Sequence, residues 1–184
     1  MNTRHGTSSL LTHHMEQIFK LASSLEGIPY GWWGGNDIEP GPPMWSKNEK
    51  LPDLRTITSC NCAGLVNLLL RKIGKPIPHS PCCGVGGTGA YVSYYRDTLC
   101  VALPFDIRVN YPTGTLLLRD FRDRVDQGHV AVLLDCKGPK SRVLQSFAHS
   151  SRTTSPGINS SYTLAESHAG YYYEYAVPPT DWLV

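Results

Sequence analysis

The sequence predicts an α+β fold in which a cysteine-bearing helix packs on an antiparallel β-sheet. Between Ser59 and Gly74, apolar residues recur at the spacing of a helix that is buried on most of its circumference. After Tyr111 the pattern changes to β-branched or aromatic runs bounded by Gly, Pro and charged residues, which is typical of antiparallel strands. We expect these strands at Thr115 to Leu118, His129 to Leu134, Arg142 to Phe147 and Tyr171 to Val177.

The length and composition of the chain fit one globular domain. With 184 residues, 41% of them hydrophobic and 17% charged, the chain can bury one substantial core, so we expect a single domain over residues 1–184. A net charge of +2 without a basic stripe argues against a nucleic-acid partner. The polar start from Asn2 to His14 has no apolar run long enough for a signal peptide or a membrane span. We therefore expect a chain that is intracellular or delivered by a non-classical route.

The first predicted element is an N-terminal helix that packs one face on the core. Its apolar residues recur at helical spacing, and Gly27 follows them as a stop signal. Ser8 or Ser9 is suited to cap its start. The apolar face consists of Leu11, Met15, Ile18, Ala22 and Leu25.

The helix that contains Cys62 has its own start and stop signals. Ser59 or Asn61 can cap its start, and Gly74 ends it. Cys62 falls in the first turn, where unpaired backbone N–H groups and the positive end of the helix lower the pKa of a thiol and favour the nucleophilic thiolate. The alternative is that Cys62 is a small buried hydrophobic residue on a core helix.

Two motifs resemble one enzyme family. Asn61-Cys62-Ala63-Gly64-Leu65-Val66 resembles the nucleophile motif Asp-Cys-Ser-Gly-Leu-Val of the NlpC/P60 cysteine peptidases, with Asn and Ala in place of Asp and Ser. The run from Gly128 to Leu134 is similar to the family's Gly-His-Val-Gly-Ile strand, whose histidine is the base. The resemblance covers roughly residues 16–177 and implies a papain-like NlpC/P60 fold. In that fold Cys62 would be the nucleophile and His129 the base, forming a thiolate–imidazolium pair near neutral pH.

A third polar residue should orient the imidazole of His129. Period-two alternation places Gln145, Phe147 and His149 on one face of the strand that begins at Arg142. The resemblance favours Gln145, because Leu-Gln-Ser stands where the family usually has Ile-His-Ala. The turn after this strand is longer than usual in the family, so His149 is the alternative.

A segment rich in glycine and aromatic residues adds a fourth candidate. The run from Gly27 to Gly35 has too many glycines and aromatics for a regular element, and it is similar to the family's Gly-x-Pro-Tyr-x-Trp-Gly-Gly segment with one extra residue. The resemblance implies that Tyr30 faces the nucleophile and donates a hydrogen bond to an oxyanion beside the Cys62 N–H. The alternative for Tyr30 is core packing. The loop from Asn36 to Leu54 is longer than in the family and is a candidate for the wall of the substrate cleft.

The cysteines allow a competing interpretation as a metal site. The chain has six cysteines, at 60, 62, 82, 83, 100 and 136, whose clustering does not resemble a disulfide framework, so we expect mostly reduced thiols. A zinc site could use Cys60, Cys62, His79, Cys82 and Cys83, but Cys-x-Cys and Cys-Cys match the usual ligand spacing poorly. We therefore expect no metal and no cofactor. The glycines from Gly84 to Gly89 lack the Lys and Ser/Thr of a phosphate loop.

The resemblance implies a cysteine hydrolase of peptide or muropeptide substrates. Such an enzyme attacks an amide carbonyl, forms a thioester acyl-enzyme and releases it to water. The family commonly cuts cell-wall peptides at D-γ-glutamyl linkages. The alternatives are a thiol acyltransferase or amidase on the same fold, and a non-catalytic zinc-containing binding module. The sequence carries no signal for the oligomeric state.

Overall fold

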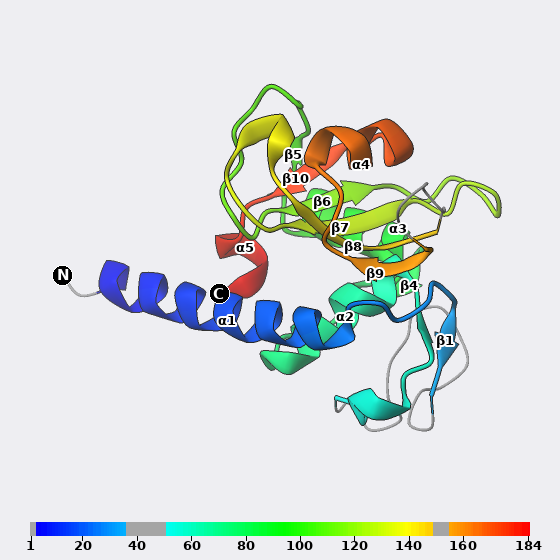
Figure 1. The fold of residues 1–184 in the computed structure, drawn as a ribbon. Coiled ribbons are helices and arrows are strands. Elements are labelled where there is room, and N and C mark those ends of the chain that lie inside the picture. The colour runs from blue at the N-terminus through cyan, green and yellow to red at the C-terminus, as the bar shows by residue number, and fades with distance from the viewer. Residues whose placement is uncertain (1–2, 36–50, 149–154) are drawn as a thin grey trace.

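An antiparallel sheet forms the centre of the computed structural model, which describes residues 3–35, 51–148 and 155–184 (Figure 1). Within these residues the largest sheet has six strands in the order β5-β10-β6-β7-β8-β9. Each neighbouring pair is antiparallel. The strands are β5 (Leu103–Pro104), β6 (Leu116–Arg119), β7 (His129–Leu133), β8 (Val143–Phe147), β9 (Gly157–Asn159) and β10 (Tyr175–Val177).

Alternating side chains of the central strands form two hydrophobic clusters, one on each face of the sheet. Leu116 and Leu118 of β6 belong to the cluster that includes α1 (Thr3–Leu25) and α2 (Cys62–Lys72). Leu117 belongs to the second cluster, with Leu164 of α4 (Leu164–Tyr171). Figure 1 shows α1 and α2 on one side of the sheet and α4 on the other. The period of two explains why these strands read as almost continuous apolar runs, since both faces are covered.

The helix α2 confirms the prediction from its apolar spacing. Asn61 caps it, and its side-chain Oδ1 accepts a hydrogen bond from the Gly64 N–H at 2.6 Å. Residues 62 to 70 are all buried, and the helix packs against β7 and β8. Gly74, with φ +68°, ends it in a conformation that glycine adopts without steric cost. The polar residue Asn67 of this helix is also buried, and it is hydrogen-bonded to Tyr91 and Gly86.

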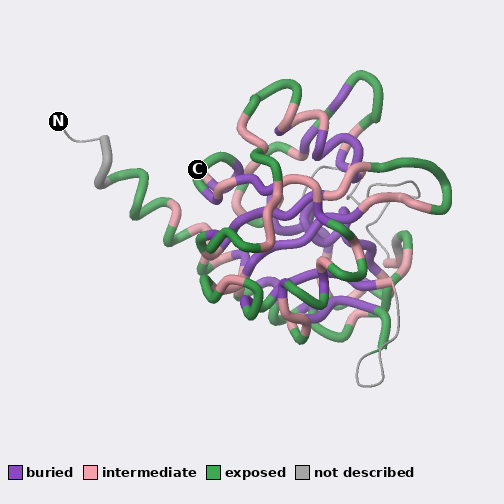
Figure 2. The backbone as a smooth tube through the Cα atoms, turned by 90° about the horizontal axis from the view of Figure 1, so that it is seen from above, coloured by how far each residue is buried: buried purple, intermediate pink, exposed green. Residues whose placement is uncertain are grey.

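The first helix is longer than predicted. Helix α1 begins at Thr3, so the expectation that Ser8 or Ser9 caps it was wrong; both lie inside the helix. The Ser8 carbonyl accepts the hydroxyl proton of Thr12, as in a helix interior. Residues 6 to 10 are exposed (Figure 2), whereas the second half packs on the core. Adding turns to a helix nucleated by packing costs little, which explains the extension.

The predicted strand from Tyr171 to Val177 was wrong in its first half. Helix α4 ends at Tyr171, Tyr172 takes a left-handed conformation with φ +52°, and only Tyr175–Val177 form the strand β10. A capping box starts α4, in which Thr163 and Glu166 each accept the other's backbone N–H. This Thr-x-x-Glu signal is visible in the sequence and competes successfully with the β propensity of the tyrosines. The other three predicted strands are confirmed as β6, β7 and β8.

Short elements surround the start of α2. The strand β1 (Trp33–Gly34) pairs with β2 (Ser59–Cys60), so the glycine-rich segment forms one short regular element, contrary to expectation. The hairpin β3 (His79–Ser80) and β4 (Gly84–Val85) precedes α3 (Thr88–Val92) and the π-helical turn η2 (Ser93–Thr98). Helix α5 (Thr180–Leu183) and the 3-10 turns η1 (Leu54–Thr56) and η3 (Gly138–Lys140) complete the described elements.

Two further predictions concern the wall of the substrate cleft and the absence of a membrane span. Most of the loop from Asn36 to Leu54, the candidate cleft wall, lies outside the described residues. Of the helices that the structure describes, none has the length and apolar character needed to cross a membrane.

Candidate active site

Cys62 is the first residue of α2 and is almost fully buried. Its side chain is 5% exposed, and burial raises its pKa to about 11. Hydrogen bonds from the backbone N–H groups of Val130, Ala63 and Cys62 itself lower that pKa but do not outweigh the burial. The sequence predicted only the lowering effect of the helix start. At neutral pH the sulfur therefore carries its proton. This differs from the resting thiolate that was expected, because the burial that raises the pKa follows from tertiary packing.

His129 is brought to Cys62 by the start of β7. It is the first residue of that strand and is 1% exposed. The N–H of the next residue, Val130, is one of the backbone groups that bond to the Cys62 sulfur. Gly128 precedes His129 with φ +71°, and a Cβ there would lie 2.6 Å from the Arg119 carbonyl oxygen. Only glycine fits this turn, which sets where the strand and its histidine begin.

Gln145 holds the imidazole of His129. The two side chains lie on adjacent strands, and His129 Nε2 is 2.9 Å from Gln145 Oε1. Since an amide oxygen only accepts hydrogen bonds, Nε2 carries the proton, and Nδ1 of the neutral ring is then the acceptor nitrogen. Of the two candidates for a third member, Gln145 is therefore adjacent to His129; His149 lies outside the described residues.

Two hydroxyl groups fix the amide of Gln145. Ser167 Oγ donates to Gln145 Oε1 at 2.8 Å, and Tyr173 Oη lies 2.6 Å from Ser167 Oγ and 3.4 Å from the same amide oxygen. All three side chains are buried. Gln145 Nε2 is buried and has no hydrogen-bond partner among the described residues, so the contacts that orient the amide all converge on its oxygen. Neither Ser167 nor Tyr173 stands in a motif that marks it in the sequence as a site residue.

Tyr171 covers the imidazole of His129. The two rings are stacked, with centroids 3.5 Å apart and an interplanar angle of 2°. The Tyr171 hydroxyl accepts the Ala148 N–H at 3.0 Å, which ties the ring to the end of β8. Ser167 and Tyr171 are four residues apart on α4 and so share one face of that helix. In the sequence, Tyr171 belongs to a run of tyrosines that was predicted to form a strand, so its contact with His129 was not expected.

Tyr30 lies beside Cys62, where the resemblance placed it. Its side chain is 36% exposed and lines the same cavity as Cys62. Burial, and then the nearby Cys62 sulfur, raise the pKa of the Tyr30 phenol well above its ordinary value. The phenol is therefore a protonated hydrogen-bond donor at every physiological pH. A residue that serves only core packing would not be exposed to this extent.

A cavity of about 640 Å³ opens in front of Cys62. His129 and Gln145 are buried and are not part of its lining. This volume lies within the usual range for sites that bind small molecules or peptides. The Thr88 hydroxyl donates to the Gln127 carbonyl, and this hydrogen bond joins the two parts of the cavity lining to which these residues belong. The lining residues with polar or aromatic side chains are Tyr30, Trp32, Asn61, Cys62, Cys82, Cys83, Thr88, Asp120, Phe121, Arg124 and Gln127.

The zinc interpretation finds no support in the described part of the chain. Cys60 is buried, and its S–H donates to the Asn61 carbonyl at 3.4 Å. Nowhere in residues 3–35, 51–148 and 155–184 do three or more His, Cys, Asp or Glu side chains come together as a possible metal site. The four cysteines and the histidine considered from the sequence therefore do not form one metal-binding cluster.

Comparisons with known proteins point to one fold. No family model and no curated protein sequence matches the chain. The peptidoglycan hydrolase RipB from Mycobacterium tuberculosis aligns over 97% of this chain and 73% of its own, with 17% identity and a TM-score of 0.51. The P60 domain of the antigen MAP1204 from M. avium subspecies paratuberculosis aligns over 92% of this chain and 97% of its own, with 19% identity and a TM-score of 0.46. Both are NlpC/P60 proteins, and the likeness to RipB shows that this chain has the α+β fold of the NlpC/P60 domains.

Proposed function

We propose that this protein is a cysteine hydrolase that cleaves an amide bond, with Cys62 as nucleophile, His129 as general base and Gln145 as the residue that orients it. The observation that carries the proposal is the 2.9 Å hydrogen bond from His129 to Gln145, next to a sulfur that the Val130 N–H contacts. A nucleophile, a base and a residue that orients the base form the arrangement used for covalent catalysis.

The first chemical step begins from a protonated thiol. Because burial raises the pKa of Cys62 to about 11, His129 takes the proton at Nδ1 as the sulfur attacks the carbonyl carbon of the substrate. The imidazolium then donates this proton to the leaving amine, and the C–N bond breaks to leave a thioester on Cys62. His129 next activates a water molecule, which attacks the thioester and releases the carboxylic acid.

The oxyanion of each tetrahedral intermediate needs hydrogen-bond donors. The Cys62 N–H belongs to the first turn of α2 and has no carbonyl partner within the helix, so it can exchange its contact with the Cys62 sulfur for the oxyanion. Tyr30 adds a phenol that stays protonated because its pKa is raised. Two such donors in a partly buried site stabilise a developing negative charge more strongly than water does.

The substrate that we propose is a cell-wall peptide cut at a D-γ-glutamyl linkage. The bond is implied by the sequence resemblance, and the peptidoglycan substrate by the likeness in fold to RipB, a peptidoglycan hydrolase. The cavity suits a peptide of mixed character, since Trp32 and Phe121 are exposed aromatic groups and Asp120 and Arg124 add one charge of each sign.

A defined panel of muropeptides, analysed by mass spectrometry, tests activity and bond choice together. The wild-type protein should split a D-γ-glutamyl peptide, whereas Cys62→Ala should not. Cys100→Ala is the matched control, because Cys100 is exposed and outside the cavity lining. A Cys62→Ala variant that cleaves at the wild-type rate would contradict the proposal. Transfer of the acyl group to added amines in preference to water would instead assign the protein to the acyltransferases.

A further inference from the structure

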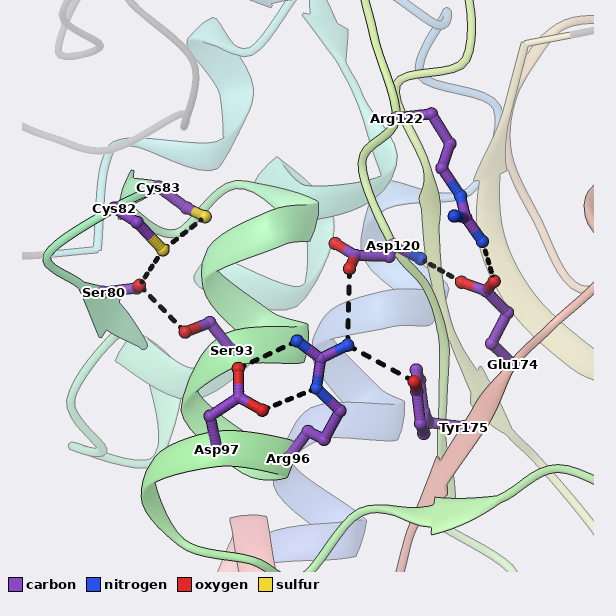
Figure 3. Close-up of polar contacts among 10 residues, drawn as sticks. All are labelled: Ser80, Cys82, Cys83, Ser93, Arg96, Asp97, Asp120, Arg122, Glu174 and Tyr175. Atoms are coloured by element: carbon purple, nitrogen blue, oxygen red, sulfur yellow. Dashed lines mark hydrogen bonds and ion pairs between the residues drawn. The ribbon is translucent and has the colours of Figure 1, made fainter.

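Two adjacent cysteines that the proposed reaction does not use lie on the wall of the cavity. Cys82 and Cys83 directly follow β3 (Figure 3). Both are exposed, and both line the cavity that also reaches Cys62. Their sulfur atoms are 3.1 Å apart and share a hydrogen bond. They are free thiols, so each sulfur is available to a reagent that enters the cavity.

Hydroxyl groups surround one sulfur of the pair. Ser80 Oγ lies 3.0 Å from Cys82 Sγ and 2.9 Å from Ser93 Oγ on η2, as Figure 3 shows. A hydroxyl proton rotates to suit its partners, so Ser80 can turn its O–H toward the sulfur when Cys82 loses its proton. The bonds with Ser80 and Cys83 lower the pKa of Cys82.

The sulfur of Cys83 has a different environment. Its bond with Cys82 and its partial burial raise the pKa of Cys83, and the Asp120 carboxylate adds to this effect. Asp120 is held in place by an ion pair with Arg96 at 3.6 Å, and its N–H donates to Glu174 at 2.9 Å. The pKa values of the two thiols are therefore shifted in opposite directions, lowered at Cys82 and raised at Cys83.

We propose that Cys82 and Cys83 form a modification site for low-molecular-weight disulfides such as oxidised glutathione. The Cys82 thiolate attacks one sulfur of the reagent, the S–S bond breaks and one thiolate leaves, which gives a mixed disulfide on Cys82. Cys83 then loses its proton to water and attacks the Cys82 sulfur, which expels the second thiolate. Two protein thiols are oxidised to the Cys82–Cys83 disulfide, and one reagent disulfide is reduced to two thiols.

The product should be reversible. Adjacent Cα atoms are about 3.8 Å apart across a trans peptide bond, which is shorter than the usual Cα separation of a disulfide. A strained and exposed disulfide is reduced easily by free thiols. While the mixed disulfide lasts, its second half occupies the cavity in front of Cys62, because Cys82 is part of the lining.

The test uses the full chain and oxidised glutathione, with intact mass and peptide mapping as readouts. We expect Cys83→Ser to accumulate one glutathione on Cys82, and the wild type to lose two hydrogens in the peptide that contains both cysteines. Cys100 and Cys136 are exposed controls in the same molecule and should react at least about tenfold more slowly than Cys82. Dithiothreitol should restore the starting mass.

Several results would overturn this assignment. These are first modification at Cys83, equal rates at Cys82, Cys100 and Cys136, or a disulfide that joins Cys82 to Cys62. Cys82→Ser should abolish the fast reaction, and circular dichroism shows whether each serine variant is folded. None of these readouts requires hydrolase activity, so failure of the proposed function would leave the result intact.

Discussion

The ring of Tyr171 lies parallel to the imidazole of His129, with centroids 3.5 Å apart. Gln145 holds the same imidazole at its Nε2 edge. One contact fixes the plane of the ring and the other fixes its rotation, so His129 has a single orientation before any substrate binds. Orientation of this kind supplies much of the rate advantage of a positioned base.

Replacement of Tyr171 should separate stacking from hydrogen bonding. Tyr171→Phe keeps the ring over His129 and removes only the hydroxyl that accepts the Ala148 N–H, so kcat should stay close to wild type. Tyr171→Leu removes the stack, and kcat should fall by roughly tenfold to a hundredfold because the base is less well aligned. Steady-state kinetics on a muropeptide that the wild-type protein cleaves give the kcat of both variants. Equal losses in the two variants would show that the hydroxyl, and not the stack, matters.

Removal of Gln145 should damage catalysis more than removal of His149. Gln145→Ala takes away the acceptor of the His129 proton, and kcat should fall by roughly a hundredfold or more. Gln145→His, which installs the residue that the related family usually has, should recover part of the loss. Ser167→Ala is the matched control, since it removes one donor to Gln145 and leaves the bond to His129. If His149→Ala were the more harmful change, His149 would take the role proposed for Gln145.

The phenol of Tyr30 should contribute to rate and little to stability. Tyr30→Phe removes one hydroxyl from a side chain that is 36% exposed, so the melting temperature should hold. If the phenol donates to the oxyanion, kcat should fall by about a hundredfold. A variant with unchanged kcat and a clearly lower melting temperature would return Tyr30 to a packing role.

The pKa of Cys62 predicts a specific pH dependence. Since the folded-state pKa is raised from 9.0 to about 11, the thiolate fraction of Cys62 should rise steadily with pH up to about pH 11. Alkylation of Cys62 by iodoacetamide in the resting protein should follow this rise, and Cys82 should react first at neutral pH because its pKa is lowered. Peptide mapping of the alkylated protein measures both rates. A plateau for Cys62 near neutral pH would indicate a resting thiolate.

The same shift links Cys62 to stability. A group whose pKa is raised on folding contributes stability that is complete below its unfolded pKa and is lost as pH rises through the folded value. The contribution of Cys62 should thus be complete below about pH 9 and disappear toward pH 11. Denaturant unfolding of wild type and Cys62→Ala across this range gives the comparison, and an equal pH dependence in both would exclude the effect.

The parts of the fold that local patterns encode were predictable from the sequence. Helix α2, its Asn61 cap and the strands β6, β7 and β8 follow from apolar spacing and turn residues that lie within each element. The proposal that Cys62 works together with His129 came from two motifs in the right order. Their separation of 67 positions along the chain is closed only by the packing of α2 on β7.

The residues that contact His129 and Gln145 from helix α4 and its end were not predictable in the same way. Ser167, Tyr171 and Tyr173 reach the site only because α4 folds back over the sheet, and the tyrosine run also has high β propensity. The ionisation state of Cys62 was misjudged for a related reason. A helix start lowers a thiol pKa locally, whereas burial depends on what the rest of the chain places around it.

Direct detection of the acyl-enzyme tests the central claim, which is that Cys62 attacks the substrate carbonyl. The protein is mixed with a muropeptide that it cleaves, and the reaction is stopped rapidly with acid. Peptide mass mapping should then show the substrate's acyl group bound to Cys62 as a thioester. The adduct should be absent in Cys62→Ala and should accumulate when deacylation is slowed. An acyl group found on another cysteine, or turnover in Cys62→Ala at the wild-type rate, would contradict the account.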